Sequence, residues 1–594
     1  MATGRGSGQG WDLGRAVGPL LDPDSPSSRC FTLFAMVHHH LLQVVDDLEF
    51  YEECGTGGVF SLDEHRAIAA VCNSLVVRGL LAQGRGQKAS LPRSKRLPDA
   101  LRAAAALQAA LHDRDARRSF AGADLWLAPL IAAGMRPEHL VEPAVLRALD
   151  AQTDAAAEVR DDVTALDPSS DSQPVSTPAA ALAALVRIAP QCVPFEARVE
   201  LLRALIRADR ARLRLDLPPA EGGPFPVEFR VRRSHLREDG AGALLRLGES
   251  VKRRLSVQFV DAHGLPEAGI DMGGLQKEFL ERFVAAVTDL RCGLFAQSGA
   301  AVFPSPLAGE LEGGWPALEA AGVALGKALH EGVLLEVPLA PFFVRRLQGR
   351  AVPSEELHSL DADLYRSLLQ LKTLDAATVD ALDLDFTVES DHFGRKTCEE
   401  LVPGGARVAV TAANRLQYIH CLAHWHLSRR LGPSAEVFTR GLKKVIPVAW
   451  LRLFTPAELN QLLGGGQSGR IDVDDLRRHT EYSGGYTERS SAVKAFWSCL
   501  EEMTAEERAA VLKFATSTSR PPLGGFQHLV PPFTIHKVAS SASPLAIFGA
   551  RDVDRLPTAS TCTNTLKLPD FRRRSTLREK LLYAVQSGAG FDLS

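Results

Sequence analysis

The sequence predicts an α+β protein of several domains, and three observations lead to this prediction. The chain has 594 residues, which is too long for one hydrophobic core, so we expect about two to four domains. In its first part, apolar side chains recur at the period of a helix, as in Phe34, Val37 and Leu41. After about residue 229, short β-like runs such as 257–260 alternate with helical patterns.

The N-terminal part is expected to be helical. Residues 1–28 are rich in glycine, proline and serine, so we expect them to be disordered. Residues 29–228 are expected to form an all-α region, because helical patterns fill most of this range. A run of serine, aspartate and proline at 167–178 and a proline- and glycine-rich run at 218–226 are typical of linkers within it.

The C-terminal part is expected to form two blocks. Asp271 stands where the N-cap of a helix belongs, and an apolar helical stripe follows it. Glycine-rich runs at 464–466 and 483–485 indicate flexible joints. We therefore predict a large block at 229–480 and a small block at 481–594.

Composition and charge argue against several classes of protein. The formal net charge is −3 and the charged fraction is 23%, so neither a nucleic acid partner nor an anionic membrane surface is indicated. No apolar run approaches the roughly 18–20 residues that would cross a bilayer, so we expect no membrane span. The first residues lack the apolar segment of a signal peptide, so we expect a cytoplasmic protein, with the nucleus as the alternative location.

Neither a metal site nor a cofactor site is indicated. The nine cysteines are scattered and include no Cys-x-x-Cys pair, which argues against a disulfide framework and a structural zinc site. His420, His424 and His426 lie close in sequence, but no glutamate follows the first of them as in a zinc protease. We therefore expect no metal ligands and no cofactor, and we interpret most cysteines as buried thiols.

Cys562 is the exception among the cysteines. Small polar residues flank it, and these cannot bury its sulfur under large side chains. Leu566 and Leu568 then alternate as in a short strand, which Pro569 ends. Cations near the sulfur would favour the thiolate of a group whose ordinary pKa is ~8.5. The neighbouring cations in sequence are Arg551, Arg555, Lys567, Arg572, Arg573 and Arg574. Taken alone, this segment also fits an ordinary half-buried cysteine.

The segment 556–571 resembles the C-terminal lobe of the HECT-type ubiquitin ligases. The residues that match the family's pattern around its catalytic cysteine are Leu556, Pro557, Thr561, Cys562, Asn564, Leu566, Leu568 and Pro569. Further short motifs follow one another in the family's order between 269 and 526; they include Lys277-Glu278-Phe279, Leu325-Gly326-Lys327, Pro403-Gly404-Gly405, Gly484-Gly485-Tyr486 and Ser519-Arg520-Pro521-Pro522. The resemblance covers about residues 230–594, and its specificity comes from the ordered series.

The resemblance implies a fold, a reaction and partners. The fold would be a bilobal HECT catalytic domain, with a large, mostly helical N-lobe at 229–480 and a small α/β C-lobe at 481–594. Cys562 would be the nucleophile that accepts ubiquitin from a ubiquitin-conjugating enzyme as a thioester and passes it to a lysine of a protein substrate. The conjugating enzyme would dock within about 360–446, and the reaction would need no cofactor.

Three more residues receive supporting roles from the resemblance: Thr561, Asn564 and Phe591. The end of the chain, 590–594, resembles one branch of the family, in which a helical region precedes the catalytic domain and members often carry a calmodulin-binding IQ motif. No Ile-Gln-x-x-x-Arg sequence occurs in this chain, which puts calmodulin control in doubt. Phe591 matches the family's functional phenylalanine fourth from the C-terminus, and docking of the final helix is its alternative role.

Two rival functions stay open at this stage. The first is a non-catalytic scaffold, because Thr563 and Thr565 stand where family members commonly carry larger apolar residues that pack the cysteine loop. The second is a thiol hydrolase with Cys562 as nucleophile. It would need a histidine base, for which His528 and His536 are the nearest in sequence, and no acidic partner is evident.

Overall fold

The computed structural model describes the residues from 19 to 587 with several gaps. The described ranges are 19–22, 24–51, 60–84, 98–153, 177–261, 265, 274–392, 394–465, 471–538 and 555–587. They form two compact units, of which the first comprises Met1–Asp209, Gln348–Glu355 and Ala449–Thr455, and the second Arg210–Leu347, Glu356–Val448 and Pro456–Ser594.

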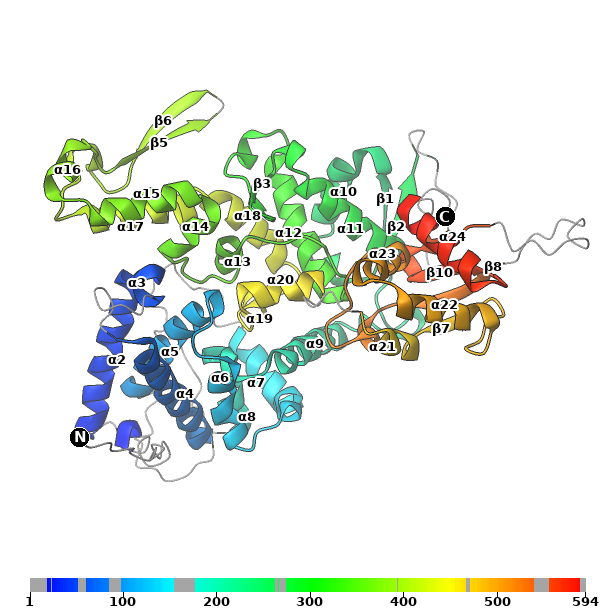
Figure 1. Ribbon diagram of the computed structural model, residues 1–594, viewed down its shortest axis with the longest axis horizontal. Coiled ribbons are helices and arrows are strands. Elements are labelled where there is room, and N and C mark those ends of the chain that lie inside the picture. The colour runs from blue at the N-terminus through cyan, green and yellow to red at the C-terminus, as the bar shows by residue number, and fades with distance from the viewer. Residues whose placement is uncertain are drawn as a thin grey trace, which may run out of the picture. The chain divides into compact units, whose positions relative to one another are not determined.

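The first unit is built from helices throughout its described residues. They are α2 (Pro26–Val44), α3 (Asp47–Tyr51), α4 (Leu62–Gly84), α5 (Asp99–Arg117), α6 (Ala123–Ala132), α7 (Pro143–Thr153), α8 (Pro178–Ile188) and most of α9 (Phe195–Arg212). The helix α4 packs against α5, α6 and α8, as Figure 1 shows. A buried polar group links these helices, since the amide of Asn73 donates to the carbonyl of Trp126 (2.8 Å) and accepts from Gln108 (2.8 Å).

The helix α2 differs from its sequence-based description in two respects. It begins at Pro26, inside the range 1–28 that was expected to be disordered, because proline is well suited to the first turn of a helix. Its buried face carries Ala35, His38 and Leu42, whereas Val37 from the predicted apolar stripe is 60% exposed. The periodicity therefore predicted a helix correctly but did not identify the face that it buries.

The buried face of α2 contains a histidine in an aromatic cluster. The ring of His38 lies 4.7 Å from Phe60 and 5.2 Å from His65, measured between centroids. Neither ring nitrogen of His38 has a hydrogen-bond partner within the described part of the chain. Burial lowers the pKa of His38, and likewise that of His65, to about 4. Both rings therefore stay neutral near pH 7.

The second unit contains a large block, which we define as its described residues from 227 to 465. Its elements are β1 (Val227–Arg232), α10 (Leu236–Arg246), β2 (Leu255–Val260), α11 (Gly274–Thr288), β3 (Phe295–Ser298), β4 (Ala301–Pro304), α12 (Gly314–Glu331), α13 (Pro341–Leu347), α14 (Leu357–Leu360), α15 (Ala362–Thr373), α16 (Ala376–Ala381), β5 (Thr387–His392), β6 (Arg395–Glu400), α17 (Arg415–His424), α18 (Gly432–Lys443), the start of α19 (Val448–Leu451) and α20 (Pro456–Gly464). Each of its three sheets has two strands: β1 pairs with β2 in parallel, while β3–β4 and β5–β6 are antiparallel.

The centre of the large block is α12, which packs against α10, α11 and α18. Its alanine-rich sequence favours a helix, and Gly332 ends it in the left-handed conformation (φ 71°). The crossing with α18 is unusually close at two glycines. A Cβ atom added to Gly322 would lie 1.9 Å from the carbonyl oxygen of Phe438, and one added to Gly441 would lie 1.9 Å from that of Glu319. Only glycine allows the two backbones to approach in this way.

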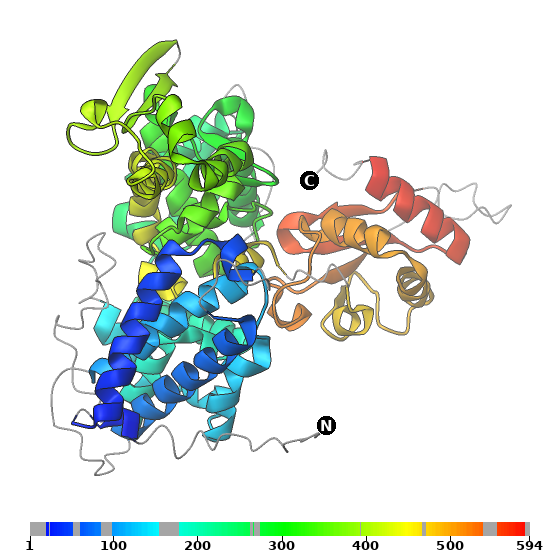
Figure 2. The ribbon, with the colours of Figure 1, turned by 60° about the vertical axis from the view of Figure 1, so that its left-hand side comes forward.

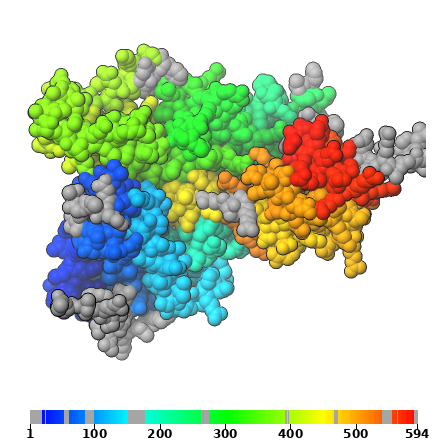
Figure 3. Space-filling view, in the orientation of Figure 1, coloured from blue at the N-terminus to red at the C-terminus, as the bar shows by residue number. Residues whose placement is uncertain are grey.

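The C-terminal block, defined as the described residues 471–587, combines helices with one four-stranded sheet. Its elements are α21 (Val473–Arg478), β7 (Glu481–Ser483), α22 (Ser491–Glu502), α23 (Ala505–Thr516), β8 (Thr534–Val538), β9 (Thr558–Ser560), β10 (Thr565–Pro569) and α24 (Arg574–Ser587). The strand order is β7-β8-β10-β9, in which only β9 and β10 pair antiparallel. Figure 2 shows the orange helices and the red α24 beside these strands, and Figure 3 shows α24 at the surface of the block.

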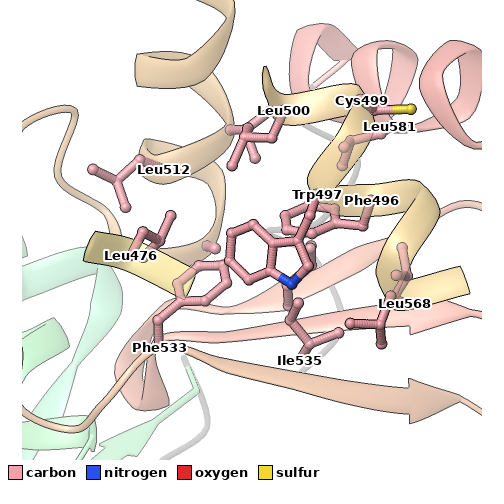
Figure 4. Close-up of a cluster of buried hydrophobic side chains, with 14 of the residues drawn as sticks. Leu476, Phe496, Trp497, Cys499, Leu500, Leu512, Phe533, Ile535, Leu568 and Leu581 are labelled. Carbon is pink, nitrogen blue, oxygen red and sulfur yellow. The ribbon is translucent and has the colours of Figure 1, made fainter. Parts of the chain in front are cut away.

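A single hydrophobic core holds the C-terminal block together. Trp497 and Phe496 of α22 lie between the sheet residues Ile535 and Leu568 and the helices, as Figure 4 shows. The same core includes Leu476, together with Ile471 and Val473. Apolar side chains of α21, which precedes residue 480, therefore pack with the C-terminal block, and the boundary between 480 and 481 stays a prediction from the sequence. Of the two predicted glycine-rich joints, at 464–466 and 483–485, only Gly466 of the first lies outside the described residues.

The described helices include none whose length and apolarity would suit a membrane crossing.

We expect Gly441→Ala to destabilise the protein by about 1–3 kcal/mol, because the new methyl group would overlap the backbone of α12. Thermal unfolding of the full chain measures the change. Gly242→Ala in α10 is the matched control, since its Cβ would approach only the flexible end of Arg246 (3.3 Å). That substitution should leave stability unchanged or raise it by about 0.5–1 kcal/mol. Equal changes in stability for Gly441→Ala and Gly242→Ala would contradict the close approach of the α12 and α18 backbones.

Acid should destabilise the first unit through His38 and His65. Their folded pKa of about 4 lies below the ordinary value of 6.5, so the unfolded chain binds more protons between these values. Stability is therefore fully present above about pH 6.5 and declines as the pH falls towards 4. His38→Leu should make this decline shallower in pH-dependent thermal unfolding. His40→Leu, at an exposed site on the same helix, should leave it as in the wild type.

Candidate active site

Cys562 lies in the loop of a β-hairpin. The register pairs Ser560 at the end of β9 with Thr565 at the start of β10, so residues 561–564 form a four-residue connection. The first three of these residues make a 3₁₀ turn, a common arrangement for hairpin loops of this length. The structure describes the backbone of Cys562, and its side chain lies outside the description.

The hairpin is anchored by the strand that follows the cysteine. Leu566 and Leu568 of β10 are fully buried, as their alternation predicted, and β10 lies between β8 and β9. The prediction of a turn that runs into a buried strand ending at Pro569 is therefore confirmed. The sheet fixes both ends of the loop, because each end continues into a paired strand.

Asn564 closes the loop in the left-handed backbone conformation (φ 50°), which asparagine tolerates better than most residues. The residue is completely buried, and its polar groups are bonded. Its side-chain nitrogen donates to the carbonyl of Pro531 (2.5 Å), and its own carbonyl accepts from the backbone nitrogen of Thr534 (3.0 Å). Its side-chain oxygen accepts from Nζ of Lys277 (2.7 Å).

The amino group of Lys277 therefore contacts the cysteine loop from α11 in the large block. Besides Asn564, Nζ donates to the backbone carbonyls of Thr561 (3.3 Å) and Thr516 (2.7 Å). An ammonium group has three donors, and each of them has an acceptor here. Thr516 is the last residue of α23, so the positive charge also lies at the favourable, negative end of that helix.

A carboxyl group lies beside this contact. Glu281, one turn after Lys277 on α11, accepts from the hydroxyl of Ser517 (2.6 Å), and its oxygen lies 3.9 Å from Nζ of Lys277. Burial raises the pKa of the Glu281 carboxyl, while Lys277 and Ser517 act in the opposite direction. The site thus pairs the buried cation of Lys277 with a half-buried acid.

The two unusual threonines of the loop are hydrogen-bonded to each other. The hydroxyl of Thr565 donates to the carbonyl of Thr563 (3.1 Å), and the hydroxyl of Thr563 donates to that of Thr565 (3.0 Å) or to the carbonyl of Ser560 (3.3 Å). Polar contacts within the loop therefore take the place of the apolar packing that larger residues would supply. The sequence argument for a non-catalytic scaffold loses weight for this reason.

His536, one of the two histidines considered as the base of a thiol hydrolase, lies on β8 beyond the residue that adjoins the loop. His536 pairs in register with Lys567 of β10, and its Nδ1 lies 2.9 Å from the hydroxyl of Ser483 on β7. The residue of β8 next to the loop is instead Thr534. Within the described part of the chain, the hydrogen-bond partner of the His536 ring is the Ser483 hydroxyl, and a carboxylate does not hold the ring as it would in a catalytic base.

The other predicted residues have different outcomes. Arg574 forms an ion pair with Glu502 on α22. Arg551, Phe591 and Asp271 lie outside the described residues. The described ranges contain no group of three or more His, Cys, Asp or Glu side chains that could hold a metal ion, and His426 packs edge-on against Trp425 (4.8 Å between centroids).

Lys277 is the site residue whose role sequence analysis missed. The motif Lys277-Glu278-Phe279 was used only as part of the resemblance to the family. The spacing of Lys277 from apolar residues on the same helix was nevertheless a signal that it is buried. The buried residues of α11 include Leu280 and Val284, so Lys277 stands three and seven residues before apolar positions of the buried face. A lysine on a buried helix face needs a buried partner. Its acceptors come from distant parts of the chain, which one sequence does not reveal.

Comparison with known proteins identifies the class to which this fold and loop belong. A model of the HECT-domain (ubiquitin-transferase) family matches residues 281–594, and the chain belongs to that family. One relative is the ubiquitin-protein ligase E3B of Mus musculus, 33% identical over 589 residues, which cover 95% of this chain and 50% of the mouse protein. Another is the E3 ubiquitin-protein ligase HUL5 of Saccharomyces cerevisiae, 36% identical over 422 residues, which cover 68% of this chain and 44% of the yeast protein. The chain thus spans about half the length of these relatives or less.

We expect Asn564→Ala to destabilise the protein more than Asn564→Gly. Both variants remove the amide that bonds Lys277 and Pro531, but only alanine is strained at positive φ, by roughly 1–2 kcal/mol. Thermal unfolding of the two variants side by side measures this difference, since the lost hydrogen bonds are common to both. Equal melting temperatures would show that the loop can relax out of the left-handed conformation.

Proposed function

We propose that this protein is a HECT-type E3 ubiquitin-protein ligase that carries ubiquitin on Cys562. The observation that carries the proposal is the position of Cys562 in a hairpin loop fixed by β10 and by the bonds of Asn564, in a chain of the ubiquitin-transferase family. Such a loop holds the backbone of the cysteine while leaving its tip at the end of the sheet. A nucleophile that must meet two large partners in turn needs this kind of placement.

The reaction has two acyl transfers. In the first, the Cys562 thiolate attacks the thioester between ubiquitin and the conjugating enzyme; a new C–S bond forms and the enzyme's thiolate leaves. In the second, the amine of a substrate lysine attacks the new thioester, the C–N bond forms, and the thiolate of Cys562 leaves while the amine loses a proton. No redox change occurs, so the residues of this chain have to position the groups and need supply no electrons.

We propose that the large block and the C-terminal block act as the two lobes of the catalytic domain. Their separate packing supports this, because the core of the C-terminal block begins at Ile471, just after the glycines at 464–465. The conjugating enzyme would dock within about 360–446. That segment offers exposed apolar side chains, among which Leu382, Val408 and Leu416 are 40–48% exposed. Apolar anchors of this kind are typical of protein docking surfaces.

The role of the N-terminal part follows from the same proposal. The helices of the first unit would form an all-α region that recruits protein substrates or regulates the catalytic domain. Supporting roles for Thr561 and Asn564 agree with their hydrogen bonds in the loop. The roles of Phe591 and a cytoplasmic or nuclear location stay predictions from the sequence.

Incubation with activating enzyme, conjugating enzyme, ATP and ubiquitin should produce an adduct that dithiothreitol removes, visible on a non-reducing gel. Cys562→Ala should abolish it, because the acceptor sulfur is gone. Cys30→Ala removes an exposed thiol of α2 and should leave the adduct unchanged.

Other outcomes point to the rival functions. The absence of an adduct on the wild type would favour a scaffold. Release of free ubiquitin from Cys562, without transfer to added lysine, would favour a thiol hydrolase. A thiol-sensitive adduct that survives in Cys562→Ala would assign the chemistry to another cysteine.

A further inference from the structure

The contact between Lys277 and the cysteine loop links two parts of the second unit that are far apart in sequence. We call the set formed by Lys277 Nζ and three acceptors among the described residues, the carbonyls of Thr516 and Thr561 and the side-chain oxygen of Asn564, the Lys277 clamp. Two of the acceptors belong to the loop that bears Cys562: Thr561 precedes the cysteine directly, and Asn564 ends the loop. The third ends the helix α23 that packs against the loop.

Breaking only some of the hydrogen bonds of the Lys277 clamp costs free energy, because the groups that form them are buried. Lys277 is 8% exposed, and Thr516 and Asn564 are completely buried. A buried ammonium group that loses an acceptor cannot recover it from water unless the surrounding structure opens. The clamp therefore favours two alternatives, with the loop either fully docked on α11 or withdrawn from it together with its neighbours.

Two carboxylates of the large block contact the same part of the C-terminal block. Glu281 accepts from the hydroxyl of Ser517 (2.6 Å). Glu336 accepts from the backbone nitrogen of Ser519 (2.7 Å) and from Nζ of Lys513 (2.9 Å). The residues between Lys513 and Ser519 thus dock beside the cysteine loop, and these polar bonds contribute to the docking. Such contacts can be exchanged for water when the two blocks separate.

The strand β10 that follows the docked loop lies far from the segment proposed to bind the conjugating enzyme (Figure 1). Figures 1 and 2 both show α15, α17 and the β5–β6 hairpin at the opposite end of the second unit from β10 and α24. A thioester exchange requires the two sulfurs to come within bonding distance. The docked position of the loop therefore suits the second step, the transfer of ubiquitin from Cys562 to a lysine, in which the conjugating enzyme takes no part.

We propose that Lys277 is a positioning residue that holds the Cys562 loop in the orientation used for transfer of ubiquitin to lysine. This inference rests on the proposed ligase function. Lys277 exchanges no proton with the substrate; it fixes the backbone on both sides of the cysteine while the amine attacks and the C–S bond breaks. Loading of Cys562 takes place with the clamp open, so it does not depend on Lys277.

The two steps can be measured separately in the full chain. Loading is followed as the rate of adduct formation from a ubiquitin-charged conjugating enzyme. Discharge is followed in a single turnover, after activation has been stopped, with free lysine as acceptor. Lys277→Met should load within about twofold of the wild-type rate and discharge on the order of tenfold more slowly, because the loop is no longer fixed.

Three further variants test whether the slower discharge is specific to the bonds of the Lys277 clamp. Lys277→Arg keeps the charge and the donors and should recover most of the discharge rate. Lys494→Met removes an exposed lysine of α22 and should leave both steps unchanged. Asn564→Gly keeps the loop backbone but removes one acceptor, so it should slow discharge. Because the two residues act through one clamp, the double variant Lys277→Met/Asn564→Gly should be no slower than the slower single variant.

Each result supports or overturns the positioning role that we propose for the Lys277 clamp. Equal slowing of both steps in Lys277→Met, or multiplied effects in the double variant, would overturn it. Discharge at the wild-type rate in Lys277→Met would do the same while leaving the ligase function intact. Failure of the wild type to load Cys562 would instead overturn the proposed function. If Lys277→Met does not fold, Lys277→Arg and Asn564→Gly carry the test, and normal discharge by Asn564→Gly then overturns the clamp.

Discussion

The buried ammonium group of Lys277 is the interaction on which the arrangement around Cys562 depends. It satisfies a carbonyl at the end of α23, a carbonyl in the 3₁₀ turn and the side chain of Asn564 at the same time. The acceptors belong to two segments that are distant in sequence, the end of α23 and the cysteine loop, so the amino group fixes the relative positions of these two segments in a way that no local contact can. The β9–β10 hairpin holds the loop 561–564 in a fixed shape, and Lys277 fixes the position of that loop relative to α11 and α23.

This arrangement also explains why the loop tolerates small polar residues. A loop packed by large apolar side chains is held by its own core, whereas this one is held by the bonds of Asn564 and by the hydroxyl pair of Thr563 and Thr565. Hydrogen bonds fix direction as well as distance. The polar loop can therefore be as well defined as an apolar one, and it can be released into water at lower cost.

Sequence reasoning predicted what depends on neighbours in the chain. The alternation of Leu566 and Leu568 identified β10, and the small residues around Cys562 identified a turn. Sequence reasoning failed where the packing or the hydrogen bonds of a residue depend on parts of the chain that are distant in sequence. The sequence did not reveal that Leu476 packs into a core made by later helices. The partner of Lys277 is 287 positions away in Asn564, a distance across which periodicity carries no information.

The close crossing of α12 and α18 has a consequence for inherited or engineered variation. At Gly322 and Gly441 the neighbouring backbone occupies the place of a side chain, so any other amino acid would force the two helices to shift. Cells degrade chains that spend more time unfolded, and a loss of about 1–2 kcal/mol can change abundance several-fold. Substitutions at these glycines would therefore change how much of the protein a cell contains, while each surviving molecule kept its chemistry.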